Sequence, residues 1–335
     1  MNIYDISEKA GVSIATVSRV LNGNSRVSEK TRQKILAVME ETGYQPNIFA
    51  RGLGLNTMNT IGILCADSSD AVLASAVYAV EQELRKYQYD ALLCCTGYGA
   101  ELKEKYAKLL LSKRVDALIL VGSNFVEAEE EKNQYIIEAA KSVPVIIVNG
   151  WLDAPNVYCA VCDDVEVMEQ VTSQFLKRSD RILWLYRSNS FGSRSKQEGV
   201  QRAFLYEGKQ LPEQQNLLFH GSIEDTCQML LERWNNGQRW DVILCSDDEL
   251  AVGAVKFARK AGLSIPDQLQ IVGYNNSKPG ICCEPEITSI DNHLDYVSQS
   301  AVHMLMKVLE GEQIPAKLCA SAEIVTRGTT KELFE

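Results

Sequence analysis

The stretch Val12-Ser-Ile-Ala-Thr-Val-Ser-Arg-Val-Leu-Asn22 decides the fold of the N-terminal region. Ser13 is a residue type that caps helices, and no glycine or proline interrupts the eight residues from Ile14 to Leu21. One side of this predicted helix is apolar, and it carries Val17, Val20 and Leu21. The other side presents Ile14, Ala15, Thr16, Ser18 and Arg19. We therefore expect one side to pack into a core and the other to face a partner.

Two further helices are predicted around this segment. Asn2 can cap the first, with Asp5 at capping-box spacing, and Gly11 ends it. Ser28 can cap the third, which ends at Gly43. The apolar residues that would complete a shared core are Ile3, Ile6, Ala10, Ile35, Val38 and Met39.

The turn Ala10-Gly-Val-Ser13 joins the first two helices in the form of a helix-turn-helix. A second helix with hydroxyl groups and an arginine on its outer side suits the major groove of DNA, where Arg19 can pair with guanine. The alternative is an ordinary helical domain, since many such domains show hydroxyl groups and an arginine at their surface. Charge adds to the contrast along the chain: residues 1–60 carry seven basic and five acidic side chains, whereas the remainder has a net charge of −12.

Three linked motifs resemble the headpiece of the lactose-repressor (LacI/GalR) family: Val12 to Asn22, Val27-Ser-Glu-Lys-Thr-Arg32, and Gly43-Tyr-Gln-Pro-Asn47. The resemblance implies a sequence-specific, dimeric transcriptional regulator that binds a pseudo-palindromic operator in double-stranded DNA. It implies base contacts by Ile14, Ala15 and Arg19. The positions that match backbone contacts are Tyr4, Ser13, Thr16, Ser18, Asn22, Ser28 and Thr31.

Residues 47–58 are similar to the family's hinge segment, which becomes helical on DNA and inserts a leucine into the minor groove. By that likeness Ala50, Arg51 and Leu53 contact DNA. Gly52 and Gly54 depart from the family pattern and disfavour a helix by about 0.5–1 kcal/mol each. We expect three parts: a DNA-binding domain over 1–46, a hinge over 47–58, and an effector-binding and dimerisation domain over 59–335.

From Thr60 onward, short apolar runs alternate with amphipathic helical patterns, which predicts parallel sheets covered by helices on both faces. Two successive sets, divided near residues 149–156, predict two lobes. The whole body resembles the two-lobed, periplasmic-binding-protein-like effector domain of the same family. The expected fold class is therefore α/β, with a small all-α head. The chain ends without a heptad helix of the kind that makes tetramers in this family, so we expect a homodimer.

Ligands in such folds bind beyond the carboxyl ends of the strands. The resemblance implies effector contacts by Lys196, Asp247 and Asn275, each of a different residue type from the one usual in the family. Ser69 and Asp70 replace a stretch that usually supplies stacking aromatics, and Phe191 or Trp151 are the rings that could substitute. The expected effector is a small polar molecule, most simply a sugar or sugar derivative, although a protein co-regulator is the alternative.

Composition and the absence of certain motifs bear on the location of the protein and on other functional classes. The chain has 335 residues, a net charge of −10, ten cysteines, no long apolar run and no recognisable signal peptide, so we expect a cytoplasmic protein with reduced thiols and no contact with a membrane. No recognised catalytic motif occurs, and neither a cofactor nor a metal is expected; Cys159-Ala-Val-Cys162 lacks a second pair. A solute-binding protein would explain the body but needs a signal peptide. An α/β enzyme would leave the first 58 residues without a role.

Overall fold

The computed structural model describes residues 2–21, 26–44 and 57–332, and these form an N-terminal head and a larger body. In the head, α1 (Ile3–Ala10), α2 (Ile14–Leu21) and α3 (Glu29–Thr42) surround one small core. Its fully buried members are Ile6, Ala10, Val17, Val20 and Ile35. The predicted helices and their shared core are confirmed.

Local capping explains where these helices begin and end. The Asn2 side chain accepts hydrogen bonds from the backbone of Tyr4 and Asp5, and the Asp5 carboxylate accepts one from the Asn2 amide at 2.8 Å. Gly11 ends α1 with a φ of 62°, a left-handed conformation that glycine adopts without steric cost. Ser28 caps α3 by accepting a hydrogen bond from the Thr31 amide.

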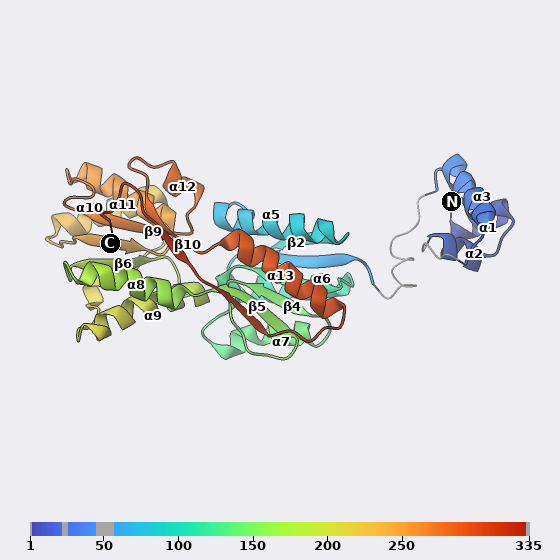
Figure 1. The fold of residues 1–335 in the computed structure, drawn as a ribbon, viewed down its shortest axis with the longest axis horizontal. Coiled ribbons are helices and arrows are strands. Elements are labelled where there is room, and N and C mark those ends of the chain that lie inside the picture. The colour runs from blue at the N-terminus through green and yellow to red at the C-terminus, as the bar shows by residue number, and fades with distance from the viewer. Residues whose placement is uncertain (1, 22–25, 45–56, 333–335) are drawn as a thin grey trace. The chain divides into compact units, whose positions relative to one another are not determined.

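The body consists of two α/β lobes, each built on a six-stranded sheet (Figure 1). The first sheet has the order β11-β5-β4-β3-β1-β2. Its strands are β1 (Thr60–Cys65), β2 (Asp90–Cys95), β3 (Ala117–Val121), β4 (Val145–Val148), β5 (Val157–Cys162) and β11 (Lys317–Ala320). The helices of this lobe are α5 (Ala71–Lys86), α6 (Ala100–Ser112), α7 (Gln134–Ala140) and α13 (Leu294–Leu309), and α5 and α13 share a core with the sheet.

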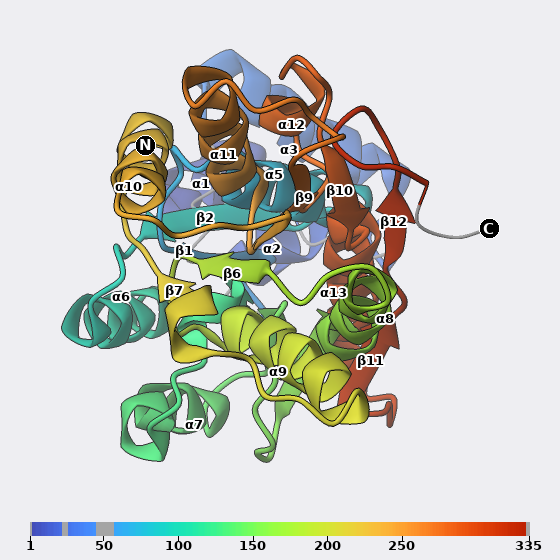
Figure 2. The ribbon, with the colours of Figure 1, turned by 90° about the vertical axis from the view of Figure 1, so that its left-hand side faces the viewer.

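The second sheet has the order β12-β10-β9-β8-β6-β7. Its strands are β6 (Ile182–Tyr186), β7 (Asn216–Leu218), β8 (Val242–Cys245), β9 (Gln270–Tyr274), β10 (Thr288–Asp291) and β12 (Glu323–Val325). Figure 2 shows α8 (Asp164–Leu176) and α9 (Phe191–Tyr206) on one face. The other face carries α10 (Ile223–Asn235), α11 (Asp248–Lys260) and α12 (Lys278–Ile281). The pairs β6–β8, β8–β9 and β9–β10 are parallel, and β12 runs antiparallel to β10.

The chain passes between the lobes three times within residues 57–332: from β5 to α8, from β10 to α13, and from β11 to β12. The expected division near residues 149–156 is wrong. That polar stretch is a loop between neighbouring strands, since Val145 of β4 lies beside Val157 of β5 in the same sheet. Asn149 and Asn156 both have a φ of 61°, which turns the chain back within the first lobe.

Within the described residues, none of the helices combines the length and the apolar character that crossing a bilayer requires.

Candidate effector site and DNA-binding face

The outer side of α2 is exposed while its inner side is buried. Val17 and Val20 pack in the core of the head, whereas Ile14, Ala15 and Arg19 are exposed on the same helix. Tyr4, at the start of α1, is 65% exposed. Thr16, Ser18 and Thr31 are half-buried, and Ser13 and Ser28 are exposed. The sequence-predicted contacts at Asn22, Ala50, Arg51 and Leu53 lie outside the described residues.

Hydroxyl groups at the starts of α2 and α3 form the same local arrangement. Ser13 Oγ lies 2.9 Å from Thr16 Oγ1, and Ser28 Oγ lies 2.9 Å from Thr31 Oγ1. Each serine oxygen also accepts a hydrogen bond from the threonine amide. Both helix N-termini therefore present hydroxyl groups together with the positive end of the helix dipole, which is suited to a phosphate oxygen.

In the body, a cavity of about 630 Å³ lies where the strands of both sheets end. It is lined by residues that directly follow β3, β4, β6, β8, β9 and β10: Gly122, Asn149, Arg187, Ser246, Asn275 and Asn292. Ser123 of the first lobe donates a hydrogen bond to Ser190 of the second at 3.1 Å, so the lobes meet beside this cavity. A polar space between two mainly parallel sheets, beyond the carboxyl ends of their parallel strands, is where this architecture binds ligands.

An ion pair occupies one side of the cavity. The Arg187 guanidinium donates to both carboxylate oxygens of Asp247, at 3.1 and 3.2 Å, and to the carbonyl oxygen of Gly221 at 2.7 Å. Asp247 also caps α11 by accepting a hydrogen bond from the Leu250 amide at 2.9 Å. Partial burial lowers the pKa of Arg187, but its hydrogen bonds to Asp247 and the negative charges of Asp247 and Glu249 raise the pKa overall. Arg187 therefore stays charged and fixes Asp247.

A buried charged group lies deeper in the cavity. Lys196 is 9% exposed, and its ammonium donates to the carbonyl oxygen of Ser246 at 3.0 Å and lies 3.6 Å from the centre of the Tyr274 ring. The Tyr274 hydroxyl donates to Asp164 at 2.5 Å. Burial lowers the pKa of Lys196, an effect opposed by the negative charge of Asp164. Burial raises the pKa of Asp164, an effect opposed by Lys196 and by the tyrosine hydrogen bond.

Three amide side chains at the cavity carry buried polar atoms that have no hydrogen-bond partner within residues 57–332: Asn124 Nδ2, Asn149 Oδ1 and Asn292 Oδ1. The Asn292 amide nitrogen donates to Asn275 Oδ1 at 3.2 Å, so only its oxygen remains unused. Buried polar atoms in native proteins nearly always have partners. All three residues line the cavity, while the unpaired atoms themselves are buried behind its surface.

The structure places four of the six predicted effector contacts at the cavity: Asp70, Lys196, Asp247 and Asn275. Ser69 and Phe191 do not line it, because Ser69 bonds to Asp67 at 2.6 Å and Phe191 opens α9 just before the lining residue Gly192. Trp151 also lies outside the lining, and its ring faces Lys317. The expected substitute rings are therefore absent from the cavity wall; Tyr98 is an aromatic that does line it.

Sequence reasoning missed several lining residues. Arg187 could have been found, because it directly follows β6 at the carboxyl end of a buried strand. Lys103 had no such signal: it lies in the first turns of α6, is 1% exposed, and pairs with Glu127 at 2.6 Å. Asp164 at the start of α8 had no such signal either, whereas His220, just beyond the carboxyl end of β7, could have been found in the same way as Arg187.

The pair Cys159 and Cys162 is buried in β5. Burial raises the pKa of Cys159 to about 11 and raises that of Cys162 further. A reactive thiol needs a lowered pKa, so the shift opposes redox chemistry at this motif.

A helix-turn-helix head joined to a two-lobed α/β body with a polar cavity defines the class of DNA-binding transcriptional regulators that carry a ligand-binding domain. Residues 2–47 match the family model described as bacterial regulatory proteins of the lacI family, and residues 58–325 match that of periplasmic binding proteins and the sugar binding domain of the LacI family. The chain is 50% identical to an HTH-type transcriptional regulator of Lachnoclostridium phytofermentans, over 98% of its own length and 99% of the relative's. The chain belongs to the LacI family, and it is a DNA-binding transcriptional regulator.

Two more distant proteins agree with this assignment. Catabolite control protein A of Staphylococcus aureus is 28% identical over 99% of each chain. The crystal structure of the Lac repressor dimer bound to operator and the anti-inducer ONPF matches with a TM-score of 0.84, at 23% identity over 98% of each chain, which shows a shared fold. These proteins are transcription regulators and not enzymes.

Proposed function

We propose that this chain is a dimeric repressor whose affinity for a pseudo-palindromic operator changes when a small polyhydroxylated molecule binds in the body cavity. In this proposal the outer side of α2 reads bases through Ile14, Ala15 and Arg19, and the segment 47–58 connects the head, 1–46, to the regulatory body, 59–335. The chain would act in the cytoplasm, where the operator DNA is. The two family models and the HTH-type transcriptional regulator of Lachnoclostridium phytofermentans support the assignment of both parts.

The observation that carries the effector class is the set of unused amide atoms on Asn124, Asn149 and Asn292. A hydroxyl group both donates and accepts a hydrogen bond, so a sugar would satisfy the one donor and the two acceptors once these side chains turn toward the cavity. Leaving such groups unpaired costs about 1–3 kcal/mol each, which makes a hydroxyl-rich ligand strongly preferred over an apolar one. A cavity of about 630 Å³ also has room for a molecule larger than a monosaccharide.

The charges around the cavity narrow the class of effector further. Six acidic side chains line it (Asp70, Glu127, Asp164, Asp247, Asp248 and Glu249) against three lysine or arginine side chains (Lys103, Arg187 and Lys196). Each of the cations is already close to a carboxylate: Lys103 to Glu127, Arg187 to Asp247, and Lys196 to Asp164. A sugar phosphate would add negative charge to a negative cavity, so a neutral sugar or an amino sugar is the better match.

A thermal-shift screen of neutral sugars, amino sugars and sugar phosphates against the full chain tests this proposal. We expect stabilisation by a member of the first or second group, because a ligand present at 100 times its Kd raises stability by about 2.7 kcal/mol. The same ligand should alter operator binding in a gel shift. Asn124→Asp, which replaces the unused donor by an acceptor, should lower the affinity for that ligand by about tenfold or more.

The matched control is Asn236→Asp, which adds the same charge at the exposed end of α10, and it should leave affinity unchanged. A response to sugar phosphates alone would contradict the effector class. Stabilisation by none of the three groups, together with a response to a second protein, would replace the small molecule by a protein co-regulator.

A further inference from the structure

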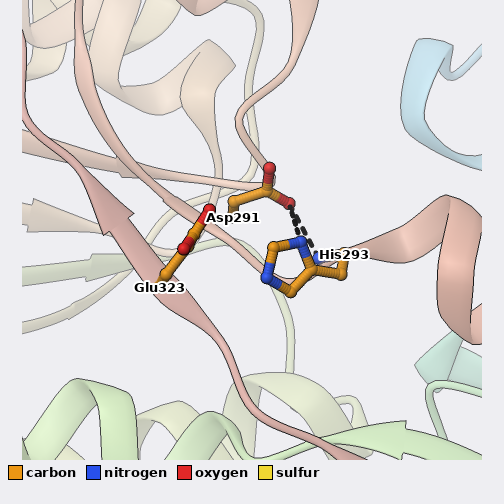
Figure 3. Close-up of side chains that lie close together, drawn as sticks. All are labelled: Asp291, His293 and Glu323. Atoms are coloured by element: carbon orange, nitrogen blue, oxygen red, sulfur yellow. Dashed lines mark hydrogen bonds and ion pairs between the residues drawn. The ribbon is translucent and has the colours of Figure 1, made fainter.

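A cluster of metal-ligating side chains lies next to the lining of the effector cavity, where the chain passes between the lobes. Asp291 ends β10, His293 precedes α13, and Glu323 begins β12 (Figure 3). One ligand atom from each residue lies within 4.8 Å of the others. None of the three lines the effector cavity.

The sheet register explains why the two carboxylates are close. Asp291 and Glu323 are direct partners in the antiparallel pair β10–β12, so their side chains leave the sheet on the same face. Like charges placed directly opposite each other destabilise a strand pair. A cation between these two groups would turn that repulsion into attraction.

The imidazole completes a ligand set of nitrogen and oxygen atoms. His293 Nδ1 lies 3.5 Å from Asp291 Oδ1. Ligand atoms about 2.0–2.2 Å from a single ion are separated by roughly 3–3.5 Å, so this pair needs little movement to share one. Glu323 is exposed, and its side chain is free to approach the other two.

Neighbouring groups hold the Asp291 carboxylate in place. Its Oδ2 accepts a hydrogen bond from Asn276 Nδ2 at 2.9 Å, and its Oδ1 accepts one from the His293 amide at 2.7 Å. Asn276 is itself fixed by Arg327, which donates to its side-chain oxygen at 2.6 Å. A carboxylate oriented by outer hydrogen bonds is typical of protein metal sites.

We propose that Asp291, His293 and Glu323 bind one divalent transition-metal ion, with water completing its coordination. Two carboxylates and one imidazole suit ions such as Mn²⁺, Co²⁺ and Zn²⁺. Asp291 and His293 lie where β10 leads into α13, and Glu323 directly follows the connection from β11 to β12. The ion therefore joins these two connections. Two of the three passages between the lobes are thereby tied together, so metal binding restricts how the lobes move relative to each other. This proposal does not depend on the identity of the effector.

Titration of the full chain with Co²⁺ tests the proposal, followed by visible absorption and calorimetry. Co²⁺ is the suitable probe because exposed cysteines such as Cys95 and Cys319 bind softer ions, and thiolate ligands give a separate near-ultraviolet band. We expect one equivalent to bind without that band and to raise the melting temperature. His293→Gln and Glu323→Gln should each weaken binding by about tenfold or more.

The matched control is His303→Gln, which removes another histidine in the same region of the chain, one that bonds to Glu83 at 2.9 Å. It should keep both the affinity and the thermal shift. Operator binding by all three variants, measured without metal, reports that they are folded. The proposal is overturned if the wild-type chain binds no Co²⁺, or if His293→Gln binds it as tightly as the wild-type chain does.

Discussion

The buried charge of Lys196 allows a quantitative test of how the body is held together around its cavity. Lys196→Met keeps most of the side-chain volume but removes the ammonium group. The change eliminates the hydrogen bond to Ser246 and the contact with the Tyr274 ring, and it leaves Asp164 with the tyrosine hydroxyl but without its cation. A hydrogen bond from a charged donor typically contributes about 1.5–3 kcal/mol, and loss of the nearby positive charge further destabilises ionised Asp164. We expect a loss of this size in the free energy of unfolding at pH 7.

A double-mutant cycle with Asp164→Asn separates the interaction between Lys196 and Asp164 from the other effects of Lys196→Met on stability. The amide introduced by this second change carries no charge, so the double variant should lose less stability than the two single variants together, with a coupling of at least about 1 kcal/mol. Urea unfolding of all four proteins measures this coupling, and tryptophan fluorescence, to which Trp184 in the core of the second lobe contributes, can follow the transition.

The pH dependence supplies an independent check. Burial raises the pKa of Asp164 above its ordinary value of 3.8, so the unfolded chain releases this proton first. Stability from this group is therefore present at low pH and is lost as the pH rises from 3.8 through the folded-state pKa. Without Lys196 the shift becomes larger, and the loss in Lys196→Met should be smaller at about pH 4–5 than at about pH 8. Additive single variants together with a loss independent of pH would refute the reasoning.

Three further predictions concern other parts of the chain. Arg19→Ala should cost about 1–3 kcal/mol in operator binding and relax the preference at one position per half-site, as measured by gel shifts on a set of operator variants; uniform weakening would reduce Arg19 to a phosphate contact. Leu53→Ala should weaken binding to the operator while leaving non-specific binding nearly intact, since an inserted side chain acts only on a kinked site; equal weakening on both DNAs would count against insertion. The ion pair with Lys86 lowers the pKa of Glu83 below 4.5, although burial opposes it, so Glu83 stabilises the body above that pH and the stability is lost as the pH falls. Glu83→Gln should therefore flatten the acid side of the stability profile, and an unchanged profile would exclude this contribution.

The head was largely predictable from sequence because its determinants are local. The capping box of Asn2 and Asp5, the end of α1 at Gly11 and the apolar side formed by Val17 and Val20 each depend on residues a few positions apart. The strands that end at the cavity were predictable for a related reason, since continuous apolar runs identify parallel strands and their carboxyl ends identify the site.

The features that the sequence did not predict depend on contacts between segments that are distant in the chain. The loop at 149–156 has the composition of a connection between lobes, and only the pairing of β4 with β5 shows that it is not one. The antiparallel strand β12 is short, and it is fixed by β10, which precedes it by more than thirty residues. Phe191 follows a predicted strand within five residues, yet the turn into α9 directs Gly192 and Ser193 to the cavity instead. These features depend on tertiary contacts, which a local sequence pattern does not reveal.

The pair Asp247 and Asn275 shows how the structure changes an interpretation based on residue type alone. Relative to the family pattern, a carboxylate and an amide are exchanged, which suggests that the carboxylate has only moved and still binds the ligand. In the structure, however, Asp247 already accepts hydrogen bonds from Arg187, from the Leu250 amide and from the Ser246 hydroxyl.

An acceptor that is committed to three donors has little capacity left for a ligand hydroxyl. Asp247 holds Arg187 in place and caps α11, while Asn275 accepts a hydrogen bond from Asn292, whose oxygen has no partner. Recognition should then depend more on the amides than on the carboxylate. It follows that Asp247→Asn, which preserves the cap acceptor, should disturb effector affinity less than Asn292→Ala does.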